Sequence, residues 1–144
     1  MVDQQALAAL RESKFGRLTV GQLMEKDVQF GFKDQKAGVL ANLMMEGFGS
    51  VPIVDRMNRL IGIVSEFDLL KAVRKGQHLN EVPAGDVMTS HPISLTQDTN
   101  ILTAIDVLQN NHLIRAPVVD ASGKLVGIIA RSDILRGYLQ TISS

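Results

Sequence analysis

The sequence contains one stretch twice, and this repeat restricts the fold more than any other feature of the chain. Residues 51–70 read VPIVDRMNRLIGIVSEFDLL, and residues 116–135 read APVVDASGKLVGIIARSDIL. Aligned at an offset of 65 residues, eight of the twenty positions are identical. Upstream, VGQLM at residues 20–24 corresponds to AGDVM at residues 84–88, with an offset of 64. Such a repeat predicts two copies of one supersecondary unit.

Both copies predict the same order of helices and strands. Apolar residues at helical spacing are followed by glycines, and two short runs rich in β-branched residues are joined by a polar turn. A further helix follows each pair of strands. The expected elements are a helix over 35–46 capped by Asp34, strands over 51–55 and 60–65, a helix over 66–75, a second-copy helix capped by Asp98 or Thr99, strands over 116–120 and 125–130, a last helix over 131–139, and an N-terminal helix over 3–13.

These elements predict an α/β fold of the α+β type, built from two β-α-β-β-α repeats. Neither repeat has enough strands to close a core alone, so we expect the two to pack sheet to sheet with pseudo-two-fold symmetry. The expected organisation is an N-terminal helix in 1–17, a first repeat in 18–76, a connector in 77–83 and a second repeat in 84–144.

Composition excludes several classes of function. The 144 residues include no cysteine, which removes disulfides, thiolate metal sites and cysteine nucleophiles. The 15 basic and 15 acidic side chains balance, whereas nucleic-acid binding usually needs a basic excess. No apolar run reaches the roughly 18 residues of a membrane span, and the polar N-terminus shows no signal peptide. We therefore expect a cytoplasmic protein that binds neither membranes nor nucleic acid.

The sequence Ser-x-x-Asp at residues 65–68 lies where a strand ends and a helix begins. The unpaired N–H groups of a first helical turn and the helix dipole favour an anion such as phosphate. A hydroxyl can donate to a phosphate oxygen, and a carboxylate can accept from both hydroxyls of a ribose. The same pattern is also that of a capping box, which needs no ligand. In the second copy Ala130 replaces the hydroxyl residue while Asp133 remains, which favours a ligand role for the aspartates.

The sequence resembles the tandem cystathionine-β-synthase (CBS) domain pair, often called a Bateman module. The resemblance covers about residues 18–140 and rests on VGQLM and AGDVM, on VPIVD and APVVD, and on GIVSEFD and GIIARSD. It implies a binding module, not an enzyme. It also implies a homodimer, and adenine-containing ligands (AMP, ADP, ATP or S-adenosylmethionine) in two clefts between the repeats. No cofactor is required.

The resemblance also implies which residues form each cleft. In the first, Asp68 would hold the ribose, Ser65 the phosphate, and Arg115 would neutralise phosphate charge. The second departs from the family pattern, since it has Ala130 and since Ser50 stands where the other repeat has Arg115. We therefore expect the first cleft to bind charged nucleotides better. The remaining residues are Pro83, Met88, Leu113 and Ile114 in the first cleft, and Thr19, Met24, Phe48, Gly49, Arg131, Ser132 and Asp133 in the second.

Two functions remain open from the sequence. The first is a small-molecule sensor that acts in trans on an unidentified regulated protein, since the repeats nearly fill the chain and we expect no attached effector domain. The second is a ligand-free module for protein–protein interaction or dimerisation. An enzyme has no support, because no Ser/His/Asp set or carboxylate pair falls on the motif positions. The histidines at 78, 91 and 112 are scattered and predict no metal site.

Overall fold

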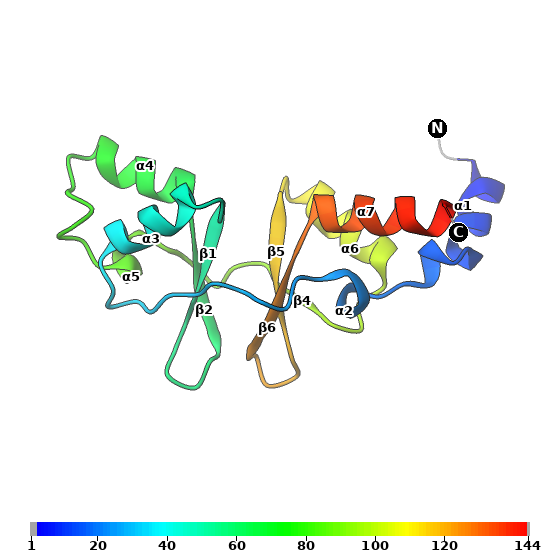
Figure 1. The fold of residues 1–144 in the computed structure, drawn as a ribbon, viewed down its shortest axis with the longest axis horizontal. Helices are drawn as coiled ribbons and strands as arrows, with labels where there is room; N and C mark the ends of the chain where they lie inside the picture. The colour runs from blue at the N-terminus through cyan, green and yellow to red at the C-terminus, as the bar shows by residue number, and fades with distance from the viewer. Residues whose placement is uncertain (1–2, 144) are drawn as a thin grey trace. The chain divides into compact units, whose positions relative to one another are not determined.

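The computed structural model describes residues 3–143 (Figure 1). Residues 1, 2 and 144, which belong to the predicted N-terminal segment and the second repeat, lie outside the described residues. The chain divides into two compact units. Unit 1 comprises Met1–Val28, Ile93–Ala121 and Val126–Ser144, and unit 2 comprises Gln29–Pro92 and Ser122–Leu125. Each has a three-stranded sheet, which confirms the α+β class; the packing of the two sheets on each other stays a prediction.

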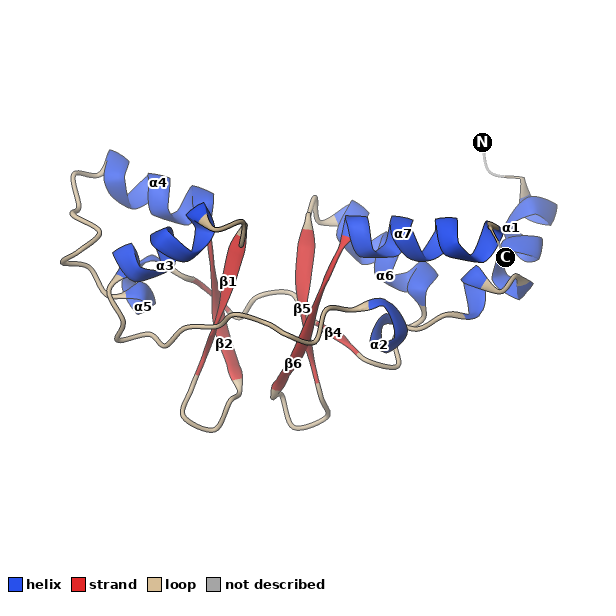
Figure 2. Cartoon of the chain, viewed as in Figure 1, coloured by secondary structure: helices blue, strands red, loops and turns tan. Residues whose placement is uncertain are grey.

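Unit 2 combines its sheet with three helices. The strands lie in the order β1-β2-β3, and both neighbouring pairs are antiparallel. Figure 2 shows the helices gathered on one face of this sheet. The elements are α3 (Ala37–Met45), β1 (Ser50–Val54), β2 (Leu60–Ser65), α4 (Glu66–Arg74), α5 (Ala84–Val87) and β3 (Thr89–Ser90).

Unit 1 contains the corresponding elements and an addition from the N-terminus. Its strands lie in the order β4-β5-β6, and β4 is parallel to β5. The elements are α1 (Gln4–Glu12), the 3-10 turn η1 (Phe15–Arg17), α2 (Val20–Leu23), β4 (Leu95–Thr96), α6 (Ile101–Asn110), β5 (Arg115–Val119), β6 (Leu125–Ala130), whose first residue is grouped with unit 2, and α7 (Arg131–Ile142).

Equivalent positions of the two repeats form the two hydrophobic cores. In unit 2, Ile53 of β1 and Val64 of β2 are fully buried beneath Leu40 of α3. At the same positions of the second repeat, Val118 and Ile129 are fully buried in unit 1. Burying an aliphatic side chain of this size stabilises a fold by about 1.5–3 kcal/mol. The repeated apolar positions therefore mark the core.

The folded units do not follow the boundaries of the repeats. The motifs at the start of each repeat, VGQLM and AGDVM, are exchanged, so that each packs in the unit formed mainly by the other repeat. Val20 and Met24 of the first repeat belong to the core of unit 1, and Ala84 of the second belongs to the core of unit 2. Backbone pairing follows the same exchange. Glu25 N donates to Ile128 O at 2.8 Å and Ile128 N donates to Glu25 O at 2.9 Å, while β3 pairs with β2. Each core is thus completed by the other repeat.

Most predicted elements are present, with small differences at their ends. β2 and β6 begin and end as predicted, while α7 extends three residues beyond the predicted Leu139. The predicted cap of α6 was wrong: Asn100, not Asp98 or Thr99, is the N-cap, and its Oδ1 accepts from Leu102 N at 2.9 Å.

The first helix of unit 2 also starts later than predicted. Lys36, not Asp34, occupies the N-cap position of α3. At the chain's start, the predicted helix over 3–13 is present as α1 with Asp3 as its N-cap, and the Asp3 carboxylate accepts from Gln5 N at 2.9 Å. Over residues 3–143 no helix is both long and apolar enough to cross a bilayer.

Candidate functional site

Ser65 and Asp68 form a closed pair of hydrogen bonds at the start of α4. Ser65 N donates to Asp68 Oδ2 at 2.9 Å, and Asp68 N donates to Ser65 Oγ at 3.2 Å. The Ser65 hydroxyl also donates to Asp68 Oδ2 at 3.0 Å. This is a capping box, and it satisfies donors that the first helical turn would leave unpaired. Both residues remain half-buried, so the pair is still accessible from solvent.

A third residue, which the sequence did not predict, joins this pair. Thr89 Oγ1 donates to Asp68 Oδ1 at 3.3 Å and to Asp68 Oδ2 at 3.4 Å. Thr89 lies in β3, which the second repeat contributes to unit 2 and which pairs with β2 at Ile63. Only its place directly after the AGDVM motif could have indicated it. The exchanged strand therefore brings a hydroxyl of one repeat to the carboxylate of the other.

Asp133 occupies the corresponding place in unit 1 but has different partners. Its Oδ2 accepts from Ala130 N at 2.8 Å, and its Oδ1 forms an ion pair with Arg136 Nη1 at 3.1 Å. The backbone half of the capping box therefore persists without a hydroxyl at position 130. The presence of Asp133 beside Ala130 therefore does not by itself favour a ligand role, because the backbone N–H of position 130 donates to this carboxylate without a hydroxyl.

Gly62 in GIVSEFD and Gly127 in GIIARSD are required because an exchanged segment packs against each of them. AGDVM lies against Gly62, and VGQLM lies against Gly127. A Cβ at Gly62 would overlap Met88 Sδ, and a Cβ at Gly127 would lie 2.6 Å from Met24 Sδ. Both distances are shorter than carbon–sulfur contacts in packed proteins. Met24 is buried with 8% exposure, and Met88 packs against the core of unit 2. The glycines thus admit the two methionines that the sequence predicted to line the clefts.

The other predicted cleft residues divide between the units. Unit 2 holds Pro83 and Met88 together with Ser65 and Asp68, while Leu113, Ile114 and Arg115 of the same predicted cleft lie in unit 1. Unit 1 holds Thr19, Met24, Ala130, Arg131, Ser132 and Asp133, while Phe48 and Gly49 lie in unit 2. Within unit 1, Arg131 N donates to Ile114 O at 3.0 Å. The complete clefts remain predictions.

Comparison with known proteins places the chain in a family. The model of the CBS domain matches residues 20–75 and 84–140, most of the sequence. The chain belongs to the CBS domain family. The uncharacterized protein MK0525 of Methanopyrus kandleri is 36% identical over 121 residues, which cover 83% of this chain and 62% of that protein. The chain spans between about half and two thirds of the length of the first curated relatives it matches.

Solved structures of CBS pairs have the same fold. CBSX2 from Arabidopsis thaliana, crystallised in complex with AMP, has a TM-score of 0.76 and 30% identity; the match covers 88% of this chain and 99% of that one. The CBS domain pair of protein MJ0100, in complex with 5-methylthioadenosine and S-adenosyl-L-methionine, has a TM-score of 0.74 and 23% identity. That match covers 85% of this chain and 96% of the other. The predicted tandem CBS pair is therefore confirmed.

Ser50 of this CBS pair is the one side chain in the described residues with a fully buried oxygen or nitrogen that has no hydrogen-bond partner. It begins β1 and lies opposite Ser65 in the β1–β2 register. An unpaired buried hydroxyl costs about 1–3 kcal/mol. In the other repeat the equivalent position is Arg115.

Hydrogen bonds in the β1–β2 turn of the first CBS domain lower the pKa of the Asp55 carboxyl group. The Arg59 N–H that donates to Asp55 lowers the pKa of this carboxyl below its usual 3.8, and burial raises the pKa by less. The Met57 N–H and the Arg59 guanidinium lower this pKa further. Arg59 Nε lies 3.0 Å from Asp55 Oδ2. This group stabilises the β1–β2 turn and lies outside the predicted clefts.

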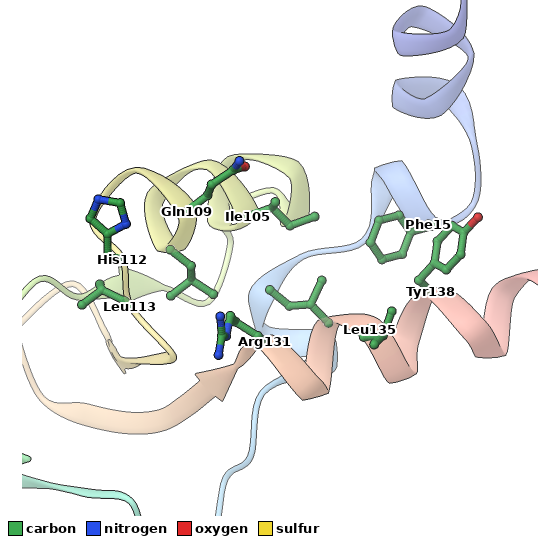
Figure 3. A pocket seen from close by; sticks show the side chains of 10 residues that line it. Phe15, Ile105, Gln109, His112, Leu113, Arg131, Leu135 and Tyr138 are labelled. Carbon is green, nitrogen blue, oxygen red and sulfur yellow. The ribbon is translucent and has the colours of Figure 1, made fainter. Parts of the chain in front are cut away.

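Unit 1 also contains a pocket of about 600 Å³ that the sequence did not predict (Figure 3). It lies between α6 and α7 and is also lined by Phe15, whose ring contacts that of Tyr138 edge to face, with the ring centroids 5.2 Å apart. Arg131 and Leu113, which were assigned to the clefts, line it. Across the described part of the chain, no group of three or more His, Cys, Asp or Glu side chains could hold a metal ion.

Proposed function

We propose that this CBS pair is a regulatory sensor that binds an adenine nucleotide and acts in trans on a partner protein. The observation that carries the proposal is the set of Ser65, Asp68 and Thr89 at the start of α4. The likeness to CBSX2, whose structure contains AMP, supports the choice of an adenine nucleotide as the ligand class. The nucleotide is a regulatory ligand, and no reaction follows from its binding.

Asp68 retains the capacity to accept hydrogen bonds from a ribose. Its Oδ2 accepts from Ser65 N, Ser65 Oγ and Thr89 Oγ1, whereas its Oδ1 accepts from Thr89 Oγ1 alone, at 3.3 Å. A carboxylate oxygen has two lone pairs, so Oδ1 can accept a further hydroxyl. Thr89 and Ser65 can turn their hydroxyls toward a ligand, which would free Asp68 for both ribose hydroxyls. The capping box and ribose binding are thus compatible.

The phosphate would lie near the first turn of α4 or the start of β5. The helix N-terminus favours negative charge, and the Ser65 hydroxyl can donate to a phosphate oxygen. Arg115, half-buried at the start of β5, is proposed to pair with the same group through its forked donors. Pro83, Met88, Leu113 and Ile114 are proposed to surround the base.

The second cleft is proposed to bind nucleotide more weakly. Asp133 Oδ1 is held in an ion pair with Arg136, and its Oδ2 accepts from Ala130 N. Position 130 has no hydroxyl for a phosphate, and Ser50 cannot replace the charge of an arginine. Arg131 and Ser132 are exposed in the first turn of α7 and offer partial compensation. A ligand with less charge than ATP suits this cleft better.

A thermal-unfolding screen tests the sensor proposal. The purified protein, stripped of nucleotide, is melted with AMP, ADP, ATP, S-adenosylmethionine and GTP in turn. A ligand at about 100 times its dissociation constant adds roughly 2.7 kcal/mol to the free energy of unfolding, which raises the Tm by several degrees. We expect a shift with at least one adenine ligand and none with GTP. No shift with any ligand at millimolar concentration would contradict the proposal.

The second candidate, an interaction module without ligand, is favoured by one observation on α4. Phe67, Leu70 and Val73 are 73%, 60% and 51% exposed at a spacing of three residues, so they share one face of the helix. We propose that this face, named the α4 face, joins two copies in a homodimer. The sensor can use this dimer, because the two functions do not exclude each other.

Light scattering coupled to size-exclusion chromatography tests the homodimer. Leu70→Glu places a charge on the α4 face, and Glu66→Gln serves as a control on the same helix. We expect the wild-type protein and the control to elute as dimers and Leu70→Glu to shift toward the monomer. A monomeric wild-type protein at all concentrations would contradict the dimer, and it would leave the nucleotide screen unaffected.

A further inference from the structure

The pocket between α6 and α7 has two chemically different ends (Figure 3). Ile105, Leu135, Tyr138 and the buried Phe15 give its body an apolar lining. His112 and Arg131 line the pocket on the side away from the two rings (Figure 3). An apolar body with a few polar groups at one place is the usual composition of a small-molecule site, and the volume lies in the usual range for such sites.

The polar end is not a general property of the repeat. At an offset of 65 residues, His112 corresponds to Gly47 and Arg131 to Glu66, so the first repeat has neither the imidazole nor the positive charge. Apolar positions nearby are kept, as Leu135 corresponds to Leu70. The fold therefore does not need His112 and Arg131 at these positions. This end of the pocket is a feature of unit 1 that unit 2 lacks.

His112 is held in a backbone conformation that disfavours a side chain. Its φ is +54°, and the equivalent Gly47 has φ +106°. A left-handed conformation is unfavourable for most residues other than glycine. Such strain at a pocket is a reason to look for a function of the side chain. The imidazole of His112 lines the pocket.

Charge at this end favours an anion. Arg131 offers a forked set of N–H donors that matches a carboxylate, and His112 adds a further donor. Arg131 is also the first residue of α7, a helix of 12 residues, so the positive end of the helix dipole lies at the same place. We propose that the pocket binds a monocarboxylate with an apolar body, such as a fatty or aryl-alkyl acid. This inference shares Arg131 with the proposed second nucleotide cleft, but it does not depend on nucleotide binding in the first.

The sequence supplies a direct probe of the pocket. Tyr138 is the chain's single tyrosine, and the chain has no tryptophan. Its ring lines the pocket, so tyrosine fluorescence reports on occupancy. The full-length protein is titrated with decanoate, and separately with decanol and decyltrimethylammonium. We expect a saturable change with decanoate at a concentration where neither of the other two gives one.

Three variants distinguish the proposal from its alternatives. His112→Gly introduces the residue of the first repeat at an equivalent position, so the fold is retained, and Arg131→Gln removes the charge. We expect each to weaken decanoate binding about tenfold or more, because a charge-assisted hydrogen bond is lost. Asp68→Asn should weaken AMP binding and leave decanoate binding unchanged, so the failure of one proposal is separable from failure of the other.

Several results would overturn the carboxylate proposal. One is the absence of saturation with decanoate. Another is equal binding of decanol and decanoate with no effect of His112→Gly or Arg131→Gln, which would show apolar binding only. A third is tyrosine fluorescence that changes with protein concentration and not with decanoate, which would show that a second copy fills the pocket.

Discussion

Met24 lies across Gly127 so closely that a Cβ on the glycine would be 2.6 Å from the methionine sulfur. The two residues come from different repeats and meet inside unit 1. We predict that Gly127→Ala lowers the free energy of unfolding by about 1–3 kcal/mol, because overpacking a core displaces side chains or backbone. Urea denaturation of the variant measures the change.

A double-mutant cycle identifies the methionine as the cause of this loss. Met24→Ala alone creates a cavity and is itself destabilising. If the sulfur is what the added methyl group meets, Gly127→Ala costs less in the Met24→Ala background than in the wild type. An equal cost in both backgrounds would contradict this assignment and would identify Glu25 O, 2.9 Å from the same Cβ, as the atom that the methyl group meets. Gly62→Ala should behave like Gly127→Ala, because Met88 lies against Gly62 in unit 2.

Asp68 forms the capping box and has a proposed role in ribose binding, and two substitutions separate the two. Asp68→Ala removes the capping box as well as the proposed ribose contact, so it should lower stability by about 1 kcal/mol. Asp68→Asn keeps a carbonyl oxygen that can accept from Ser65 N, and so it should lower stability less. Chemical denaturation compares the two variants. A larger stability loss with Asn than with Ala would contradict the geometry of the box.

Ser50 and Ser13 predict opposite effects of the same substitution. Ser50 Oγ is buried without a partner, whereas Ser13 Oγ donates to Leu10 O at 2.6 Å and accepts from Gly16 N at 3.0 Å. We expect Ser50→Ala to leave stability unchanged or raise it by up to about 1 kcal/mol, since a desolvated hydroxyl is removed. Ser13→Ala should lower it by a similar amount. Thermal unfolding of both variants tests the pair.

The lowered pKa of Asp55 predicts that the free energy of unfolding depends on pH in the acid range. Because its pKa is lowered in the folded protein, its carboxylate stabilises the fold above the ordinary value of 3.8, and the contribution disappears as pH falls through the lowered pKa. The stability difference between the wild type and Asp55→Asn should therefore be constant near neutral pH and shrink below about pH 4. Denaturation curves between pH 7 and 3 measure it. A difference that grows toward low pH would contradict the lowered pKa.

The repeat made most of the fold predictable. Fixed spacing of apolar residues located β2 and β6 to the residue, because burial of alternate side chains leaves little freedom in where such strands lie. Helix ends were less predictable. Asp98, Thr99 and Asn100 are all good N-caps, and only the backbone shows that Asn100 fills this position, where its Nδ2 also donates to Gly16 O at 2.8 Å.

Local spacing alone does not show the exchange of the VGQLM and AGDVM motifs; the family resemblance implied it by grouping Met24 with Asp133 and Met88 with Asp68. Local spacing places VGQLM beside the first repeat, while Met24 packs in the core of unit 1 with residues of the second. The same limit hid Thr89, whose partner Asp68 is 21 residues away and in the other repeat. The α6–α7 pocket was also missed, because Phe15 comes from a segment outside both repeats.

Calorimetric titration of the nucleotide-stripped protein with AMP tests the central claim most directly. We predict saturable binding to the wild-type protein, weakened about tenfold or more in Asp68→Asn, because the negative charge and one of the two acceptor oxygens for the ribose hydroxyls are lost. Asp106→Asn, which removes the same charge from an exposed position on α6, should bind AMP like the wild type. Equal affinity of Asp68→Asn and the wild type, or no binding of AMP at all, would contradict the account.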